Sequence, residues 1–391
     1  MDIHNYKRRL ERTINKVKNS NFSEENKKLI MQFHDNCFTE SLSLSKIERY
    51  LYDLIKYTEM LNKNLMDATR EDIKSIVAKI EKKEWSPHTK HAFRVMIRKF
   101  YKSIEGIDEK GVYPERVKWL HSNVKNNQLK SSEELITEFE IRKMIACSLN
   151  CRDKALISTL YESGCRISEL GLVKFKDVIF DQYGAVINVT GKTGPRRVRL
   201  VTSAPYLQDY LNKHENNENP DSFIWTKLGG KKDLLGYSRL SELIKRAAKR
   251  AGIKKRIHAH LFRHSRATFL ANKLTEAQMK QYLGWTQSSK MAAVYVHMSG
   301  RDTEDAILSM NGLKIREKEN PIEELKPRLC IKCNKQRAAT ERFCPECGLI
   351  LDEDEARKVI QTELDRNKAD EIMNQLVKDP EILELIKRKL S

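Results

Sequence analysis

Six side chains spread along the middle of the sequence belong to types that could act together on a phosphodiester bond. They are Arg166, Lys192, His260, Arg263, Trp285 and Tyr295. Cleaving such a bond without a metal needs a nucleophile, positive charge on the non-bridging oxygens and an acid for the leaving oxygen. Taken singly, each residue has an ordinary structural explanation, such as a surface ion pair or partial burial in a core. Taken together, they supply every group that the reaction needs.

The residue types and their spacing suit separate parts of this chemistry. Arginine suits the phosphate oxygens, because its planar guanidinium donates two parallel hydrogen bonds. His260 and Arg263 are three residues apart, so both fall on one face of a helix and can point at one phosphate. Lys192 lies in TGKTGPRR, where it would occupy a hairpin tip and could reach a leaving group. A tyrosine nucleophile would conserve the bond energy in a phosphotyrosine ester, so the reaction could be reversed without ATP.

The order of these motifs resembles that of the tyrosine recombinase (phage integrase) family. The sequence contains arginine in GCRISEL, lysine in the hairpin segment, His-x-x-Arg followed by His264, Leu-Gly-Trp, and tyrosine in YVH, in that order. The resemblance covers about residues 137–312 by motif and roughly 1–120 by architecture. Six ordered elements make a specific signal, whereas His-x-x-Arg alone would be weak.

The resemblance implies a role for each residue. Arg166 and Arg263 would clamp the scissile phosphate, and Lys192 would be the general acid towards the 5′-hydroxyl. His260 would assist proton transfer at the nucleophile, and Tyr295 would form a 3′-phosphotyrosyl intermediate. Catalysis would use neither metal nor ATP. Trp285 occupies the position where the family has His or Trp, and its indole N–H can donate to a phosphate oxygen. Glu169 and His264 would be supporting residues.

The hydrophobic pattern predicts a mainly α chain with a small antiparallel β-sheet in its catalytic domain. The expected divisions are 1–125, a helical core-binding domain; 126–136, a linker; 137–313, the α+β catalytic domain; 314–327, a linker; 328–350, a zinc ribbon; and 351–391, a charged amphipathic helical tail. The low content of Gly and Pro, 15 and 9 of 391 residues, favours a helix-rich chain. We expect neither a membrane span nor a signal peptide, because long apolar runs are missing and the first 18 residues are polar.

Helical periodicity and end signals predict the individual elements. In the first domain we expect helices near 25–33 and 46–65, one that begins at Thr69, and one that begins at Ser86-Pro87. Ser45 with Glu48 has the spacing of a capping box, as does Thr137 with Glu140. The second domain should contain helices at 137–149, 152–162, 237–251, 260–272, 276–283 and 288–297, and strands at 178–180, 185–189 and 197–201.

Four of the eight cysteines form two Cys-x-x-Cys pairs separated by ten residues. They are Cys330, Cys333, Cys344 and Cys347. Paired thiolates at this spacing suit tetrahedral zinc, and the second pair has the Cys-Pro-x-Cys-Gly form of a zinc ribbon. With four protein ligands the predicted single Zn²⁺ would be structural. The appended ribbon resembles those of recombinases from archaeal genomes and their mobile elements, and it should bind DNA or protein.

The charge distribution favours a nucleic-acid partner. The net charge is +19, and residues 351–391 contribute −3, so the first 350 residues carry +22. A body this basic suits a polyanion, most simply double-stranded DNA. The expected assembly is a dimer or homotetramer on DNA, with an accessory DNA-bending factor as a further candidate partner. The candidate DNA-contact residues are Lys90, Arg94, Arg98, Arg196, Arg197 and Arg199.

Three functions remain to be distinguished. The first is a site-specific recombinase, either an integrase of a mobile element or an Xer-like dimer resolvase. The second is a non-catalytic DNA-binding regulator on the same scaffold, against which the complete set of six residues argues. The third is a type IB topoisomerase, which the compact helical first domain disfavours. Tyr282 is a rival nucleophile, but it lies in an apolar helix face and is expected in the core. We expect a cytoplasmic, nucleoid-associated protein.

Overall fold

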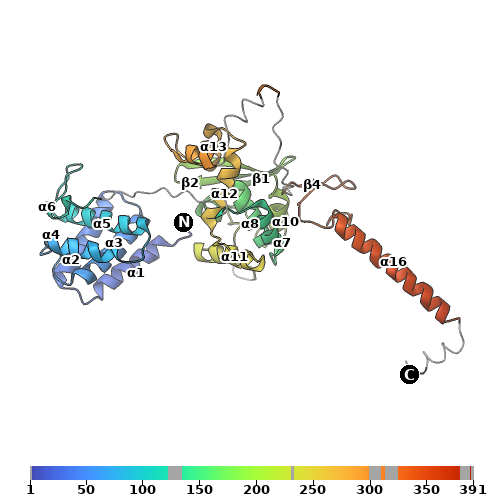
Figure 1. The fold of residues 1–391 in the computed structure, drawn as a ribbon, viewed down its shortest axis with the longest axis horizontal. Coiled ribbons are helices and arrows are strands. Elements are labelled where there is room, and N and C mark those ends of the chain that lie inside the picture. Colours follow the sequence, from blue (N-terminus) through green and yellow to red (C-terminus); the bar gives the residue numbers. More distant parts are fainter. Residues whose placement is uncertain are drawn as a thin grey trace. The chain divides into compact units, whose positions relative to one another are not determined.

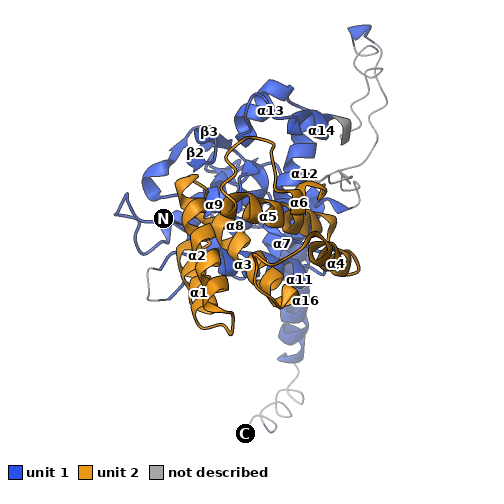
Figure 2. Ribbon diagram, turned by 90° about the vertical axis from the view of Figure 1, so that its left-hand side faces the viewer, with its two compact units in different colours: residues 1, 130–391 blue, residues 2–129 orange. Residues whose placement is uncertain are grey.

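The computed structural model describes residues 2–121, 134–229, 233–298, 310–312, 325–378 and 388. It divides into two compact units, one formed by Asp2–Leu129 and the other mainly by Lys130–Ser391, which Figure 2 distinguishes by colour. The predicted linkers at 126–136 and 314–327 lie largely outside the described residues, so their boundaries stay predictions.

The first unit is helical throughout its described elements (Figure 1). Its helices are α1 (Tyr6–Lys18), α2 (Glu24–Thr39), α3 (Leu44–Leu61), α4 (Arg70–Glu81), α5 (Pro87–Ile104) and α6 (Glu115–Lys118). Helix α3 is central, because ten of its residues are buried and it packs against α1, α2, α4 and α5. Buried tyrosines satisfy one another: the hydroxyls of Tyr57 and Tyr101 lie 2.9 Å apart, and Tyr101 donates to the carbonyl of Leu65 at 3.0 Å.

The ends of these helices follow most of the predicted signals. Thr69 caps α4 in a capping box with Asp72, and Ser86 accepts from the backbone N–H of Thr89 ahead of α5. The predicted start of α3 at Ser45 is wrong, because Ser43 precedes the helix and Leu44 is its first residue. The Glu48 carboxylate is instead buried and accepts two hydrogen bonds from Arg9 of α1, both at 3.1 Å. Helix α1 was missed by the sequence reasoning.

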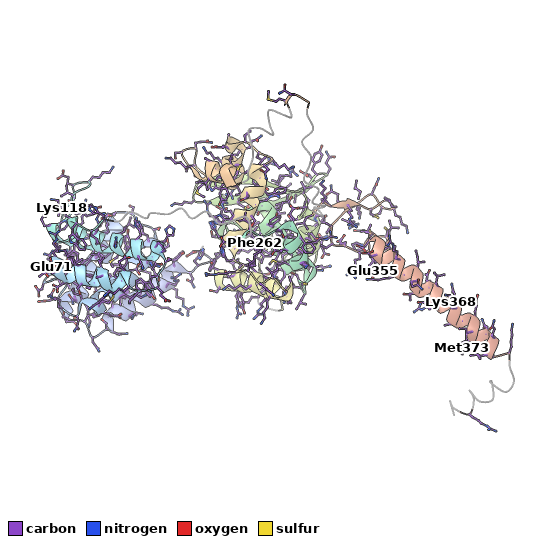
Figure 3. The ribbon with its side chains drawn as sticks, viewed as in Figure 1. Glu71, Lys118, Phe262, Glu355, Lys368 and Met373 are labelled. Atoms are coloured by element: carbon purple, nitrogen blue, oxygen red, sulfur yellow. The ribbon has the colours of Figure 1, made fainter. Side chains whose placement is uncertain are left out.

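The second unit is built around α8 (Cys151–Ser163), of which eleven residues are buried. Around it pack α7 (Glu138–Ala146), α10 (Ala204–Asn212), α12 (Ala259–Ala271) and strand β3. The side chain of Phe262, on α12, lies in this core and is labelled in Figure 3. The unit also contains α9 (Ile167–Gly171), α11 (Tyr237–Arg250), α13 (Glu276–Leu283) and α14 (Met291–Met298).

The three-stranded sheet is antiparallel in the order β1 (Val178–Asp181), β2 (Gly184–Gly191) and β3 (Gly194–Leu200). Gly191 pairs with Gly194, so Lys192 and Thr193 form a two-residue hairpin tip. The end of β3 is tied to α8 by buried Glu162, whose carboxylate accepts from the backbone N–H groups of Val201, Thr202 and Ser203 at 2.7–3.0 Å. This connection fixes the hairpin on the helical core.

The cysteine-containing region follows with short strands β4 (Arg328–Leu329) and β5 (Gln336–Arg337), which pair antiparallel, and then α16 (Glu353–Leu376). The side chains of Lys368 and Met373 project from α16 in Figure 3. Its apolar residues Ile360, Leu364 and Ile372, which belong to the apolar face of the predicted amphipathic tail, are 49–57% exposed, so these three side chains are not buried. Ile382, Leu385 and Ile386, farther along the predicted tail, lie outside the described residues. No helix in the described part of the chain is long and apolar enough to cross a membrane.

Candidate active site

The six predicted catalytic residues line one hollow of about 900 Å³ in the second unit. Arg166 precedes α9, Lys192 occupies the β2–β3 tip, and His260 and Arg263 lie on α12. Trp285 follows α13, and Tyr295 lies on α14. Among these six residues the hollow combines two arginines and a lysine with an imidazole, an indole and a phenol, from elements that span about 130 positions of the sequence.

Arg166 is held in place by a buried carboxylate. Glu169, which is 4% exposed, accepts from the Arg166 guanidinium at 2.7 Å and from its backbone N–H at 3.0 Å. The same carboxylate accepts from Nη2 of Arg196 at 2.7 Å. Burial works against the charged form, but the hydrogen bonds and charge of Arg196 and the bonds from Arg166 hold the pKa of Glu169 below its ordinary value. One carboxylate thus orients two guanidinium groups at the edge of the hollow.

Arg196 connects the hairpin to the far side of the site. Its side chain is 7% exposed, and its Nε donates to the backbone carbonyl of Tyr282 at 3.0 Å. Its Nη1 lies against Gly284, where an added Cβ would come within 2.7 Å. Gly284 also has φ +64°, and its carbonyl accepts from the hydroxyl of Thr193 at 3.1 Å. Glycine suits this turn because it adopts a positive φ without strain and has no Cβ that would collide with Arg196. The hydrogen bond from Thr193 to the turn anchors the hairpin tip beside Lys192.

Arg263 is the most enclosed cation of the site. It is 3% exposed and donates to the carbonyl of Gly164 at 2.9 Å and to that of Leu283 at 2.6 Å. Burial, together with the nearby charge of Arg166, lowers the pKa of Arg263 to about 10. The group still carries a full charge at neutral pH. Two neighbouring positive charges beside a hollow, one of them buried, favour a bound anion that gains charge.

Tyr295 is buried at the hollow, where its ring lies against that of Trp285. It is 2% exposed, and its ring stacks on Trp285 with centroids 5.5 Å apart and an interplanar angle of 6°. The guanidinium of Arg263 lies 5.4 Å from the centroid of the same indole. Burial raises the pKa of Tyr295 to about 12, although the charge of Arg263 opposes the shift. The phenol is therefore protonated at neutral pH.

The Tyr295 hydroxyl is hydrogen-bonded to Nδ1 of His264. His260, which the family resemblance placed at the nucleophile, is exposed and packs edge-on against the His264 ring, with centroids 4.5 Å apart. His264 was expected only as a supporting residue. The sequence held a signal for its position, because residues 260, 263 and 264 lie on one face of a helix.

The rival tyrosine occupies a different environment. The Tyr282 hydroxyl lies within hydrogen-bond distance of two backbone carbonyls, those of Glu162 at 3.1 Å and Arg199 at 3.2 Å. Burial raises its pKa above the ordinary value for a phenol. This residue joins α13 to α8 and β3, and it is not among the residues that line the hollow.

Comparison with known proteins identifies the domain that holds this hollow. Residues 134–301 match the family model described as "Phage integrase family". These residues form a phage integrase family domain. The family resemblance seen in the motifs is thereby confirmed for the catalytic region, whereas the cysteine-containing region lies beyond the matched residues.

Relatives extend over most of the chain. The tyrosine recombinase XerA of Pyrococcus horikoshii is 25% identical over 285 residues, which are 72% of this chain and 93% of that protein. A tyrosine recombinase of Thermosipho africanus is 26% identical over 273 residues, which are 68% of this chain and 93% of that protein.

Solved structures share the fold. XerH site-specific recombinase bound to a palindromic difH substrate has a TM-score of 0.55 and 18% identity, and the match covers 79% of this chain and 97% of that one. A lambda integrase dimer bound to a COC′ core site has a TM-score of 0.56 and 16% identity, with coverage of 70% and 78%. The mainly helical class with a small antiparallel sheet is confirmed.

The candidate DNA-contact residues of the phage integrase domain differ in their surroundings. Alternation along β3 turns Arg196 inward, where it is engaged by Glu169, and leaves Arg197 exposed. Arg199 forms an ion pair with Asp181 at 2.7 Å. In the sequence the three arginines looked equivalent, so the buried position of Arg196 was missed. Lys280, which also lines the hollow, was missed as well.

The candidate contacts on α5 of the first unit each have a protein partner. The Nζ of Lys90 donates to the Glu81 carbonyl at 2.7 Å, and Arg94 pairs with the Glu81 carboxylate at 2.9 Å. The guanidinium of Arg98 lies 3.8 Å from the ring centroid of Tyr113. All three cations remain on one helix, and their contact with DNA stays a prediction.

The four predicted metal ligands come together in two similar turns. The sulfurs of Cys330, Cys333, Cys344 and Cys347 all lie within 4.8 Å of one another. Two of the pairs are 3.5 and 3.6 Å apart, close to the separation of about 3.8 Å expected for sulfurs bound tetrahedrally at 2.3 Å. A residue with positive φ follows each Cys-x-x-Cys, Asn334 in the first turn and Gly348 in the second. The sulfur cluster fits one zinc ion.

Proposed function

We propose that this chain is a tyrosine-type site-specific DNA recombinase that cleaves and rejoins DNA strands through a 3′-phosphotyrosyl intermediate. The observation that carries the proposal is the convergence of Arg166, Arg263 and Tyr295 in one hollow. The phage integrase family domain and the relatives named tyrosine recombinases support it.

In the proposed reaction the residues act as follows. The guanidinium groups of Arg166 and Arg263 bind the non-bridging oxygens of the scissile phosphate, and their attraction grows as negative charge builds up there. Tyr295 attacks the phosphorus, while Lys192 protonates the departing 5′-oxygen from the hairpin tip. The Trp285 ring supports the phenol by stacking, and its N–H is available to a phosphate oxygen.

The partner in this proposal is double-stranded DNA, bound by a dimer or tetramer of the chain. Solved relatives of the same fold include a lambda integrase dimer on a core site and a lambda integrase tetramer on a Holliday junction. The charge of +22 over the first 350 residues supports the same partner, because phosphate neutralisation dominates DNA affinity. Such an enzyme acts at the nucleoid.

We further propose that the four cysteines hold one structural Zn²⁺. The ion would fasten the two turns to each other and leave no open coordination position for catalysis. Nη2 of Arg337 lies 3.8 Å from the sulfur of Cys333, which partly balances the negative charge of four thiolates.

Covalent trapping tests the function directly. The protein is incubated with a library of nicked DNA duplexes, and denaturing gels followed by sequencing identify any trapped ends. We expect a covalent adduct with the unmodified protein, none with Tyr295→Phe, and a normal adduct with the matched control Tyr282→Phe. DNA binding by Tyr295→Phe should be largely retained.

Other outcomes assign other functions. Sequence-specific binding without any adduct would point to the non-catalytic regulator. Relaxation of plasmids that lack every trapped sequence would point to a type IB topoisomerase. An adduct that persists in Tyr295→Phe would refute the assignment of the nucleophile.

A further inference from the structure

The contact between His264 and Tyr295 bears on how the nucleophile loses its proton. Nδ1 of His264 is hydrogen-bonded to the phenol, and the two ring centroids are 5.8 Å apart. The residues lie on different helices, α12 and α14, which pack directly against each other. Because the two helices pack against each other, their packing sets the positions of both side chains in this contact.

The buried phenol needs a base. With a pKa of about 12, only about one Tyr295 in 10⁵ would be ionised at pH 7. Attack on phosphorus is fast only if the proton leaves as the new bond forms, and a general base must lie within hydrogen-bond reach to accept it. A histidine suits this task, because its ordinary pKa of about 6.5 leaves the neutral imidazole well populated.

The other groups around the phenol are poorly suited to accept a proton. Trp285 stacks on its ring, and an indole N–H can only donate. Arg263, whose charge acts on Tyr295, stays protonated. His260 contacts the His264 ring edge-on, and its side chain is the more exposed of the two histidines.

We propose that His264 is the catalytic base for Tyr295, a role that rests on the proposed recombinase function. As the phenolic oxygen forms its bond to phosphorus, its proton passes to Nδ1 of His264. The bond from phosphorus to the 5′-oxygen breaks, and that oxygen takes a proton from Lys192. In rejoining, the 5′-hydroxyl gives its proton back to Lys192 as it attacks phosphorus, the bond from phosphorus to the phenolic oxygen breaks, and the protonated His264 returns its proton to that oxygen. His260 acts one step away, as a positioning residue that holds the His264 ring.

The required tautomer follows from this role. Nδ1 of His264 must be unprotonated to accept the phenolic hydrogen, so the ring proton resides on Nε2. The side-chain amide of asparagine can place an oxygen near the position of Nδ1, so it can accept the hydrogen bond but cannot take up the proton. His264→Asn therefore separates positioning of the phenol from proton transfer, whereas His264→Ala removes both.

The experiment measures single-turnover cleavage of a nicked substrate recovered by covalent trapping. We expect His264→Asn and His264→Ala each to slow cleavage by about 10²- to 10⁴-fold. DNA affinity and the circular dichroism spectrum should stay unchanged. His260→Asn is the matched control on the same helix face, and its cleavage rate should fall by a smaller factor than that of His264→Asn.

Two chemical substitutions identify the step. A substrate with sulfur in place of the bridging 5′-oxygen needs no acid, so it should restore cleavage by Lys192→Ala but not by the His264 variants. Replacing Tyr295 with 3-fluorotyrosine gives a more acidic phenol, which should recover part of the rate lost in His264→Asn. This recovery would not occur if His264 had only a structural role.

The results also separate this inference from the proposed function. If the unmodified protein forms an adduct and His264→Asn cleaves as fast or faster, His264 is not the base and its contact only holds a resting state. Failure of 3-fluorotyrosine to recover any rate would overturn the inference in the same way. If the unmodified protein forms no adduct on any substrate, the recombinase function itself fails.

Discussion

The hollow between Arg166 and Tyr295 gathers side chains from separate helices and a hairpin, whereas the cysteine cluster takes its four sulfurs from two turns within residues 330–347. In the hollow, several functional groups are oriented by contacts between distant segments, as when Glu169 holds Arg196 of β3. In the cluster, each turn is shaped locally by backbone hydrogen bonds, such as that from the N–H of Gly348 to the carbonyl of Cys344 at 2.8 Å. The first site therefore depends on the core around it, whereas the second would depend on the proposed zinc ion.

Removal of zinc should have the largest effect and should be confined to the cluster. A structural zinc site contributes about 10 kcal/mol or more to the folding of a small module. We expect Cys344→Ser, or a strong chelator, to release about one equivalent of zinc and to unfold residues 328–350. Zinc assay and hydrogen exchange would measure both effects. Loss of DNA cleavage together with the metal would show that the two sites are not independent.

Loss of the shared carboxylate should have the largest effect within the hollow. Glu169→Ala leaves Arg196, with a side chain 7% exposed, without its charge partner, and breaking a buried pair costs about 3–5 kcal/mol. Cleavage should fall further than DNA affinity, because Arg166 loses its orientation. Urea unfolding and single-turnover cleavage would measure the two effects.

The same carboxylate gives a pH dependence with a definite sign. The pKa of Glu169 is lower in the folded state than in the unfolded chain, so the unfolded chain binds protons first as the pH falls. Its contribution to stability is full above its unfolded pKa of about 4.3 and is lost as the pH falls through the folded value. In Glu169→Gln the free energy of unfolding should therefore fall less steeply as the pH is lowered below about 4.3. An unchanged dependence on pH in this range would contradict the role given to the ion pair of Glu169 and Arg196.

The sequence predicted the cluster almost completely and the hollow only in part, for the same physical reason. The two Cys-x-x-Cys pairs form local turns, so their spacing alone predicted the four cysteines that come together. In the hollow, motif order identified the six main residues, but the burial of Arg196 depends on which face of β3 meets α9 and α13. Likewise, His264 contacts the phenol only because α14 packs on α12.

The ends of the helices also show which features can be predicted from neighbouring residues and which depend on distant contacts. Thr69 and Thr137 cap their helices as predicted, because a capping box is complete within four residues. Ser45 is not a cap, because α3 already begins at Leu44, and Glu48 bonds to Arg9 of another helix. Helix α10 was missed, and its start is fixed by Glu162 from α8. Local signals therefore predict local structure, and tertiary partners decide the rest.

A glycine pair offers a matched test of the close packing in the hollow. Gly284 and Gly252 have φ of +64° and +69°, but only an added Cβ at Gly284 meets a neighbour, Nη1 of Arg196 at 2.7 Å. Alanine at either position costs about 1–2 kcal/mol in backbone strain. Gly284→Ala should cost about 1–3 kcal/mol more through crowding and should slow cleavage. Equal unfolding free energies for the two variants would show that the Arg196 side chain can move away from the added methyl group without a loss of stability.

The smallest effect is expected where the cysteine region meets the domain that carries the hollow. The hydroxyls of Tyr206, on α10, and Thr340 lie 2.6 Å apart, and the N–H of Thr340 donates to the Tyr206 oxygen at 3.2 Å. Tyr206→Phe should weaken this attachment by about 1 kcal/mol, since it removes neutral hydrogen bonds. We expect faster hydrogen exchange in residues 336–342 with zinc content and cleavage unchanged. The control Thr340→Ser keeps a hydroxyl and should exchange normally. If Tyr206→Phe also slowed DNA cleavage, the cysteine region would be shown to support the active site through α10. The cysteine cluster and the hollow would then not be independent sites.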